Sequence, residues 1–228
     1  MSLRRLKECV WEANRRLHDL GLVVHTWGNA SARDPETGLI AIKPSGVPYG
    51  ELTPALISIV RPDGEPVEGE KPSSDTPTHL VLYREFQGVG GVVHTHSPHA
   101  TAWAQARRPI PCLGTTHADH FLGEIPVTEP MTAEEIAADY EANTGEVIVR
   151  CLAGKDPLEM PAVLVAGHGP FVWGATVEEA VMNASVLEHV AAMAAMTLTL
   201  RPDAEPIDEA LLRRHFFRKH GPDAYYGQ

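Results

Sequence analysis

Two short segments, each with an apolar run followed by histidine, constrain the fold of this chain more than any other feature. They are "GGVVHTHS" at residues 90–97 and "PAVLVAGHGPFVWG" at residues 161–174. Short apolar runs bounded by glycine predict buried strands, and the second segment predicts two strands around a bend at Gly167 and Gly169. A buried sheet needs covering layers, which the rest of the chain has to supply.

Helical periodicity in the remaining segments supplies those layers. Apolar residues recur at three- and four-residue steps from Leu3 to Leu20, with Gly21 as a C-cap. Thr132 and Glu135 form a capping box that begins another helix. The other predicted helices start near Thr76 or span residues 99–108, 176–198 and the region after 207, and strands are predicted within 38–46 and 55–69. The pattern predicts one α/β domain over residues 1–228, with a mixed sheet covered by helices.

The composition argues against several classes of protein. A formal charge of −11 disfavours a surface for nucleic acid or anionic membranes, although a local site for a small anion remains compatible with it. Three cysteines without CxxC spacing predict a reducing compartment and no disulfide framework. The first residues lack the apolar core of a signal peptide, and the longest apolar stretch, residues 186–200, is too short to cross a bilayer. These features predict a soluble, cytoplasmic protein.

His94 and His96 are candidate metal ligands. In a strand, residues i and i+2 point to the same face about 7 Å apart, so the two imidazoles would lie side by side. An isolated pair is more typical of a polar edge strand, because zinc takes about four ligands. His168 favours the metal interpretation, since it ends an apolar run and the glycines beside it leave room for an open coordination position. Asp75 could complete the shell, although taken alone it is more typical of a helix N-cap.

Three further segments carry groups that bind anions. "TWGNAS" at 26–31 offers backbone N–H groups and a side-chain amide, "IKPSG" at 42–46 offers an ammonium and a hydroxyl, and two serines precede the helix predicted near residue 76. Together they could hold a phosphate. Each is weak alone, and none is a Walker loop or a GxGxxG motif. The candidate phosphate-binding residues are Gly28, Asn29, Lys43, Ser45, Gly46, Ser73 and Ser74.

As a set, these motifs resemble the class II aldolase family, and within it the sugar-phosphate 4-epimerases. The resemblance runs in order from about Leu6 to Gln228, through "TWGNAS", "IKPSG", "KPSSDTPTH", "VVHTHSPHA", "GTTHAD", "GHGPF" and "RKHG…YYGQ". It implies a single-domain three-layer α/β/α sandwich with a central mixed, mainly antiparallel sheet. It also implies a sugar-phosphate substrate, a bound zinc ion and a cyclic homotetramer with each active site at a subunit interface.

The resemblance assigns roles to individual residues. It implies that the three histidines bind zinc with Asp75 as a fourth ligand, and that the seven anion-binding residues hold the substrate. It implies that Asp119 and Tyr226 form the acid/base pair. The residues that match positions of supporting interest are Thr115, Glu141, His215 and Arg218.

The implied reaction interconverts L-ribulose 5-phosphate and D-xylulose 5-phosphate by retro-aldol cleavage and re-addition across C3–C4. The alternative within the family is an aldolase of the L-fuculose-1-phosphate type, which typically carries glutamate where this chain has Asp75. An alternative of another class is a binding or scaffold module such as the head domains of adducins, which lack the metal histidines. A site of this composition also accepts other divalent ions, and the pathway, arabinose or ascorbate use, stays open.

Overall fold

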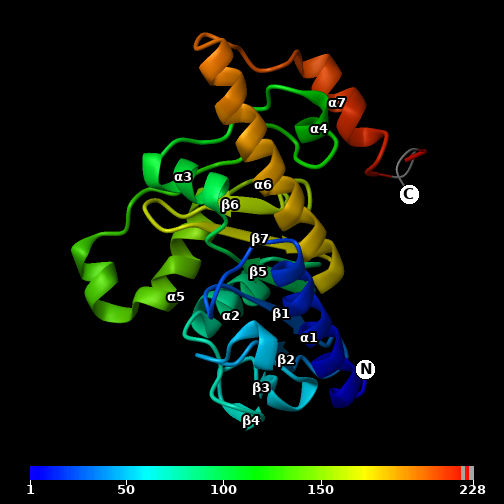
Figure 1. The fold of residues 1–228 in the computed structure, drawn as a ribbon, viewed down its shortest axis with the longest axis vertical. Coiled ribbons are helices and arrows are strands. Elements are labelled where there is room, and N and C mark those ends of the chain that lie inside the picture. Colours follow the sequence, from blue (N-terminus) through cyan, green and yellow to red (C-terminus); the bar gives the residue numbers. More distant parts are fainter. Residues whose placement is uncertain (222–223, 226–228) are drawn as a thin grey trace.

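A seven-stranded sheet forms the centre of the molecule in the computed structural model, which describes residues 1–221, 224 and 225 (Figure 1). The strands are β1 (Asn29–Arg33), β2 (Ile40–Ile42), β3 (Ser58–Val60), β4 (Pro66–Glu68), β5 (Gly91–His94), β6 (Ala162–Leu164) and β7 (Pro170–Gly174). Their order is β4-β3-β2-β1-β5-β7-β6, and each of these pairings is antiparallel. A parallel pairing occurs at the isolated bridge between Val127 and Leu164. The predicted mainly antiparallel sheet is confirmed.

Helices cover the sheet on both sides (Figure 1). The helices are α1 (Leu3–Asp19), α2 (Thr76–Glu85), α3 (Pro98–Ala106), α4 (Thr115–Ala118), α5 (Ala133–Cys151), α6 (Val177–Leu200) and α7 (Glu209–Phe217), with short 3-10 turns η1 (Tyr49–Glu51) and η2 (Pro54–Leu56). α1 and α6 pack on one side, while α2 lies on the other with α5 against it. α4 and α7 pack together near the C-terminal end of α6.

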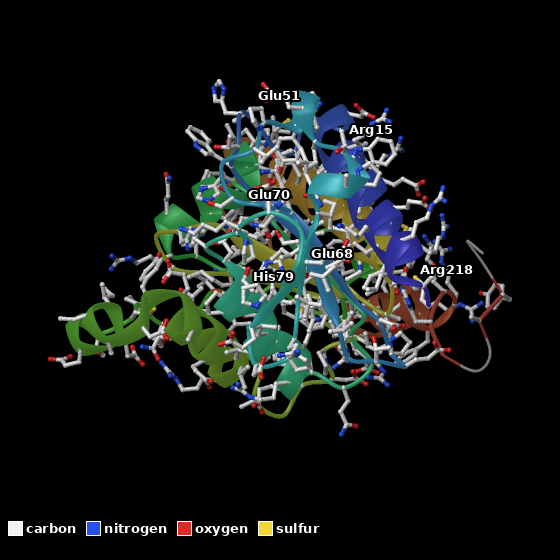
Figure 2. The ribbon with its side chains drawn as sticks, turned by 90° about the horizontal axis from the view of Figure 1, so that it is seen from below. Arg15, Glu51, Glu68, Glu70, His79 and Arg218 are labelled. Atoms are coloured by element: carbon white, nitrogen blue, oxygen red, sulfur yellow. The ribbon has the colours of Figure 1, made fainter. Side chains whose placement is uncertain are left out.

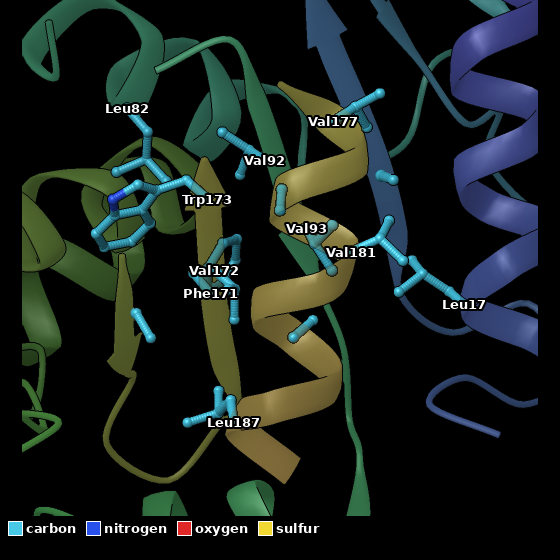
Figure 3. Close-up of a cluster of buried hydrophobic side chains, with 14 of the residues drawn as sticks. Leu17, Leu82, Val92, Val93, Phe171, Val172, Trp173, Val177, Val181 and Leu187 are labelled. Carbon is cyan, nitrogen blue, oxygen red and sulfur yellow. The ribbon is translucent and has the colours of Figure 1, made fainter. Parts of the chain in front are cut away.

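The two faces of the central strands bury different side chains (Figure 3). Val93 of β5 and Val172 of β7 are paired neighbours that face α6. Since side chains alternate along a strand, Val92 and Trp173 point to the opposite face, toward Leu82 of α2. Strands that are buried on both faces need apolar residues at every position, which explains the continuous apolar runs in the sequence.

α6 is, among the described residues, the one helix long and apolar enough to cross a membrane. Its buried residues, which include Val181, Leu187 and Val190, pack into the core of the domain. Packing against the sheet therefore accounts for much of its apolar character. Several of its other apolar side chains are exposed, including Met182 and Met196.

The predicted helices and most strands are confirmed, and the departures lie near the candidate motifs. Periodicity indicates neither β1 nor the four-residue helix α4. β1 has five residues and pairs with β2 on one side and β5 on the other. α5 contains a break at Asp139 (φ −153°, ψ 87°) that the capping box did not predict. β5 ends at His94, so the prediction that His94 and His96 share one face of a strand is wrong.

Candidate active site

Three histidines converge at one end of the central strands. His94 is the last residue of β5, His96 follows two residues later, and His168 lies in the bend between β6 and β7. The Nε2 atoms of His94 and His96 are 3.1 Å apart, and one ring nitrogen from each of the three lies within 4.8 Å of the others. The cluster therefore forms through the turn after β5, not through alternation along the strand.

The surroundings of these rings keep them neutral and orient them. Nδ1 of His94 lies 3.0 Å from the carbonyl oxygen of Pro170, and a donated hydrogen bond there turns Nε2 toward the cluster. The hydroxyl of Tyr140 lies 3.3 Å from Nδ1 of His168. Burial lowers the pKa of His94 to about 3, and burial also lowers the pKa of His96 and of His168. Neutral imidazole is the form that binds a metal ion.

The donor set fits a divalent metal ion. Zinc binds histidine nitrogen at about 2.0–2.1 Å, so tetrahedral ligands lie roughly 3.3 Å apart. The 3.1 Å separation between Nε2 of His94 and Nε2 of His96 is close to that value. Three imidazoles leave a coordination position open, as in catalytic sites.

Asp75 lies in the same cavity but outside the compact group of ring nitrogens. It occupies the N-cap position of α2, as that interpretation expects, but its side chain makes no capping bond to the helix. Instead, its Oδ2 accepts a hydrogen bond from Nδ2 of Asn29 at 2.6 Å. Burial raises the pKa of Asp75, but His94, His79 and the Asn29 bond together hold that pKa below its ordinary value. An ionised carboxylate beside neutral imidazoles favours a bound cation.

The histidines open into a cavity of about 550 Å³. Its walls come from the loop before β1, the end of β2 and the turn before α2. All seven candidate phosphate-binding residues line it, together with Asp75 and the three histidines, and the remaining lining residues are Thr26, Trp27 and Pro44. The structure thus brings the predicted anion-binding set and the predicted metal ligands into one cavity.

Two glycines allow the chain to approach His94 closely. A Cβ atom on Gly28 (φ +76°) would lie 2.8 Å from the carbonyl oxygen of His94. A Cβ atom on Gly169 would lie 2.9 Å from the carbonyl oxygen of Thr95. Both distances are shorter than a van der Waals contact, so a larger residue at either position would displace the segment that carries His94.

Lys43 supplies the ammonium group of the cavity. Its side chain is almost completely buried, at 1% exposure. Its Nζ lies 3.3 Å from the carbonyl oxygen of Pro44 and 3.5 Å from that of Thr26. Burial lowers the pKa of Lys43 to about 8, an effect that the Asp75 carboxylate only partly offsets. An anion bound beside this group would stabilise its charged form.

Asp119 belongs to a second polar group, between α4 and α7. One guanidinium nitrogen of Arg218 donates to both of its carboxylate oxygens at 3.0 Å, and Nδ1 of His215 lies 3.0 Å from Oδ1. Burial raises the pKa of Asp119, but Arg218 and His215 outweigh burial and hold it below its ordinary value. Asp119 is therefore ionised and suited to accept a proton. Thr115 begins α4, four residues before Asp119.

This second group lies apart from the histidine cavity within one chain. Neither Asp119 nor its two partners line the cavity. Figure 2 shows Arg218 at the edge of the molecule, well away from His79, whose buried ring lies close enough to influence the Asp75 carboxylate. A single chain therefore does not bring the predicted acid/base residue to the predicted metal ligands.

Two further predicted residues lie elsewhere. Glu141 is in α5, and its backbone carbonyl accepts a hydrogen bond from the hydroxyl of Thr78 at 2.5 Å. Its side chain does not line the cavity. Tyr226 lies outside the described residues. The roles of both stay predictions.

Two tyrosines touch the site although the sequence motifs do not include them. Tyr140 contacts His168 from the second segment of α5, immediately after the break at Asp139. Tyr49 donates to backbone carbonyls of the loop before β1. No local pattern indicates Tyr49, because its contacts depend on the tertiary structure.

Comparison with known protein families identifies the family of this chain. The profile described as "Class II Aldolase and Adducin N-terminal domain" matches residues 8–195. The chain belongs to this family. The class II aldolase resemblance is thereby confirmed.

Individual relatives agree with the family assignment. The chain is 52% identical over 227 residues to "L-ribulose-5-phosphate 4-epimerase UlaF" of Salmonella paratyphi A, covering 99% of this chain and 100% of that protein. The protein of the same name from Salmonella typhi has the same identity and coverage.

Solved structures of the class II aldolase family share the fold. An L-fuculose 1-phosphate aldolase superposes with a TM-score of 0.79 at 24% identity, covering 94% of this chain and 95% of the other. The L-fuculose-1-phosphate aldolase of Thermus thermophilus gives 0.68 at 28% identity, covering 88% of this chain and 99% of the other. The α/β fold expected from the sequence is confirmed.

Proposed function

We propose that this chain is a metal-dependent L-ribulose-5-phosphate 4-epimerase, an isomerase that interconverts L-ribulose 5-phosphate and D-xylulose 5-phosphate. The observation that carries the proposal is the single cavity in which three neutral histidines face an anion-binding set. The identity of 52% over almost the full length to epimerases of that name supports the substrate. In this proposal residues 1–228 form one catalytic domain of a cytoplasmic enzyme.

Different residues of the cavity would bind the metal ion and the phosphate of the substrate. His94, His96 and His168 would hold zinc or another divalent ion, with Asp75 as a candidate fourth ligand. When bound, the metal supplies a Lewis acid for the oxygens of the sugar. The phosphate would bind at Gly28, Asn29, Lys43, Ser45, Gly46, Ser73 and Ser74. The buried ammonium of Lys43 gives this end of the cavity its positive charge.

The position of the stereocentre dictates the chemistry. C4 is not adjacent to the C2 carbonyl, so a carbanion formed by simple deprotonation at C4 would not be stabilised. Breaking the C3–C4 bond instead gives the enediolate of dihydroxyacetone from C1–C3 and glycolaldehyde phosphate from C4–C5. If the aldehyde rotates, addition to its other face inverts C4. The oxygen on C4 loses a proton when the C3–C4 bond breaks and gains one when the bond forms again on the other face.

Asp119 and Tyr226 are proposed to move that proton. Asp119 is ionised, which suits the accepting role. A tyrosine hydroxyl is mostly protonated at neutral pH, which suits the donating role. Since Asp119 lies apart from the histidine cavity in one chain, we propose that a neighbouring subunit supplies this pair, with Thr115, Glu141, His215 and Arg218 in support.

The exposed apolar side chains support a homo-oligomer. On α6, Met193 and Met196 are 39% and 58% exposed, and Leu200 is 87% exposed. Leu211 of α7 is 41% exposed. Such side chains gather at subunit interfaces, and we propose a cyclic homotetramer with the sites between subunits.

Incubation of the metal-loaded protein with L-ribulose 5-phosphate should yield D-xylulose 5-phosphate as the main product, with only traces of free glycolaldehyde phosphate. Products are identified by NMR or by coupled enzyme assay, and metal-stripped protein serves as the control. The alternative is the aldolase that releases its fragments. If L-fuculose 1-phosphate were cleaved far faster than L-ribulose 5-phosphate was epimerised, the aldolase would be the correct assignment.

A further inference from the structure

We infer that Tyr49 is a positioning residue that holds together the two halves of the anion-binding end of the cavity. Tyr49 does not line the cavity itself, and its side chain is 5% exposed. It contacts both the loop before β1 and the lysine that follows β2. The inference rests on the proposed function, because it concerns the group that binds the phosphate of the substrate.

The phenol of Tyr49 orients the loop before β1. Its hydroxyl lies 2.8 Å from the carbonyl oxygen of Gly28 and 3.1 Å from that of Trp27, and it donates to these carbonyls. In a trans peptide the C=O and the following N–H point in opposite directions. A Trp27 carbonyl that faces the phenol therefore directs the N–H of Gly28 away from Tyr49. Gly28 lines the cavity and has a positive φ of 76°.

The ring of Tyr49 also stabilises the ammonium of Lys43. The Lys43 Nζ lies 4.9 Å from the ring centroid, which is within the range of a cation–π contact. The carbonyl contacts of this ammonium are long, at 3.3 and 3.5 Å. The aromatic face is therefore a substantial part of what holds the buried cation in place before an anion binds.

A third contact anchors Tyr49 to the body of the domain. The ring of His18, in α1, stacks on it with centroids 5.6 Å apart and an interplanar angle of 23°. Tyr49 thus connects α1, the loop before β1 and the residue after β2. Loss of its hydroxyl would free the loop, while loss of its ring would also weaken the hold on Lys43.

The test is the affinity of the metal-loaded protein for inorganic phosphate, measured by isothermal titration calorimetry. Tyr49→Phe keeps the ring and deletes the hydroxyl, so phosphate binding should weaken by about fivefold, the usual effect of one hydrogen bond. KM for L-ribulose 5-phosphate should rise by a similar factor, with kcat and metal content nearly unchanged. Tyr49→Leu should weaken phosphate binding further. Unchanged phosphate affinity in Tyr49→Phe would overturn the inference, whether or not the leucine variant folds.

Tyr83→Phe is the matched control. Tyr83 is also buried, at 4% exposure, and its hydroxyl lies 2.8 Å from Oγ of Ser31 instead of the loop before β1. It should lose stability without losing phosphate affinity. An equal loss of affinity in both variants would show a general effect of removing a buried hydroxyl and would reject the inference. Calorimetry does not depend on turnover, so wild-type protein that binds phosphate without epimerising would reject only the proposed function.

Discussion

His96→Ala should remove most of the bound metal and lower turnover on the order of a thousandfold, because a bound metal ion contributes several kcal/mol to such reactions. The expectation follows from the geometry of the cluster. His96 contributes one of three imidazoles whose nitrogens lie within 4.8 Å, and its Nε2 is 3.1 Å from that of His94. Two imidazoles and a carboxylate would hold the ion much more weakly. Metal content by mass spectrometry and turnover with L-ribulose 5-phosphate check the result.

His189→Ala controls for the loss of a histidine as such. His189 is exposed on α6, where its Nδ1 lies 2.8 Å from the backbone oxygen of Ser185 in its own helix. This variant should keep its metal. A His96→Ala protein with full stoichiometric metal and normal turnover would contradict the metal assignment of the cluster.

Mixed oligomers of Asp119→Asn and His96→Ala subunits should regain activity that neither variant has alone. Removal of one acid/base group typically lowers the rate on the order of 100- to 10,000-fold, so each parent is nearly inactive. If one subunit supplies the histidines and its neighbour supplies Asp119, about one quarter of the sites in a random equal mixture contain both intact parts. Activity of the mixture, after subunit exchange is verified, therefore tests whether the site is shared.

The reason to expect a shared site is the separation within one chain. Asp119 is held by Arg218 and His215 between α4 and α7, and this group does not line the histidine cavity. The matched control mixes His96→Ala with His168→Ala, whose defects lie in the same half-site, and this mixture should stay inactive. No recovery in the first mixture would reject the shared site. Recovery in both mixtures would point to reassembly of the metal centre instead.

Local sequence patterns determined most of the helices and strands. Periodicity from Leu3 to Leu20 corresponds to α1, and the capping box at Thr132 and Glu135 begins α5 with both predicted hydrogen bonds. Such patterns depend on neighbours within a few residues, so they can be interpreted without a fold. The same holds for the apolar runs of β5 and β7, which are buried on both faces and carry one polar residue, His94, at the end of β5.

The sequence also determined which residue types take part in the candidate site. They were identified from motifs that resemble those of the class II aldolase family. Three of its histidines do meet, and the seven anion-binding residues do share their cavity. Periodicity missed β1, because a short strand paired on both sides is defined by its partners and not by its own pattern. It also misjudged His96, since the end of β5 depends on where pairing with β7 stops.

Only the tertiary structure decided how the side chains of the site are held. The order β2-β1-β5-β7 pairs residues that lie far apart in the sequence, such as Asn29 with His94 and Gly91 with Gly174, and a local pattern carries no information about such contacts. Asp75 is therefore bonded to Asn29 instead of capping its own helix, and Tyr49 reaches the loop before β1. Asp119 is far from the histidines in one chain for the same reason. Its place is set by the packing of α4 on α7, which depends on contacts between distant parts of the sequence.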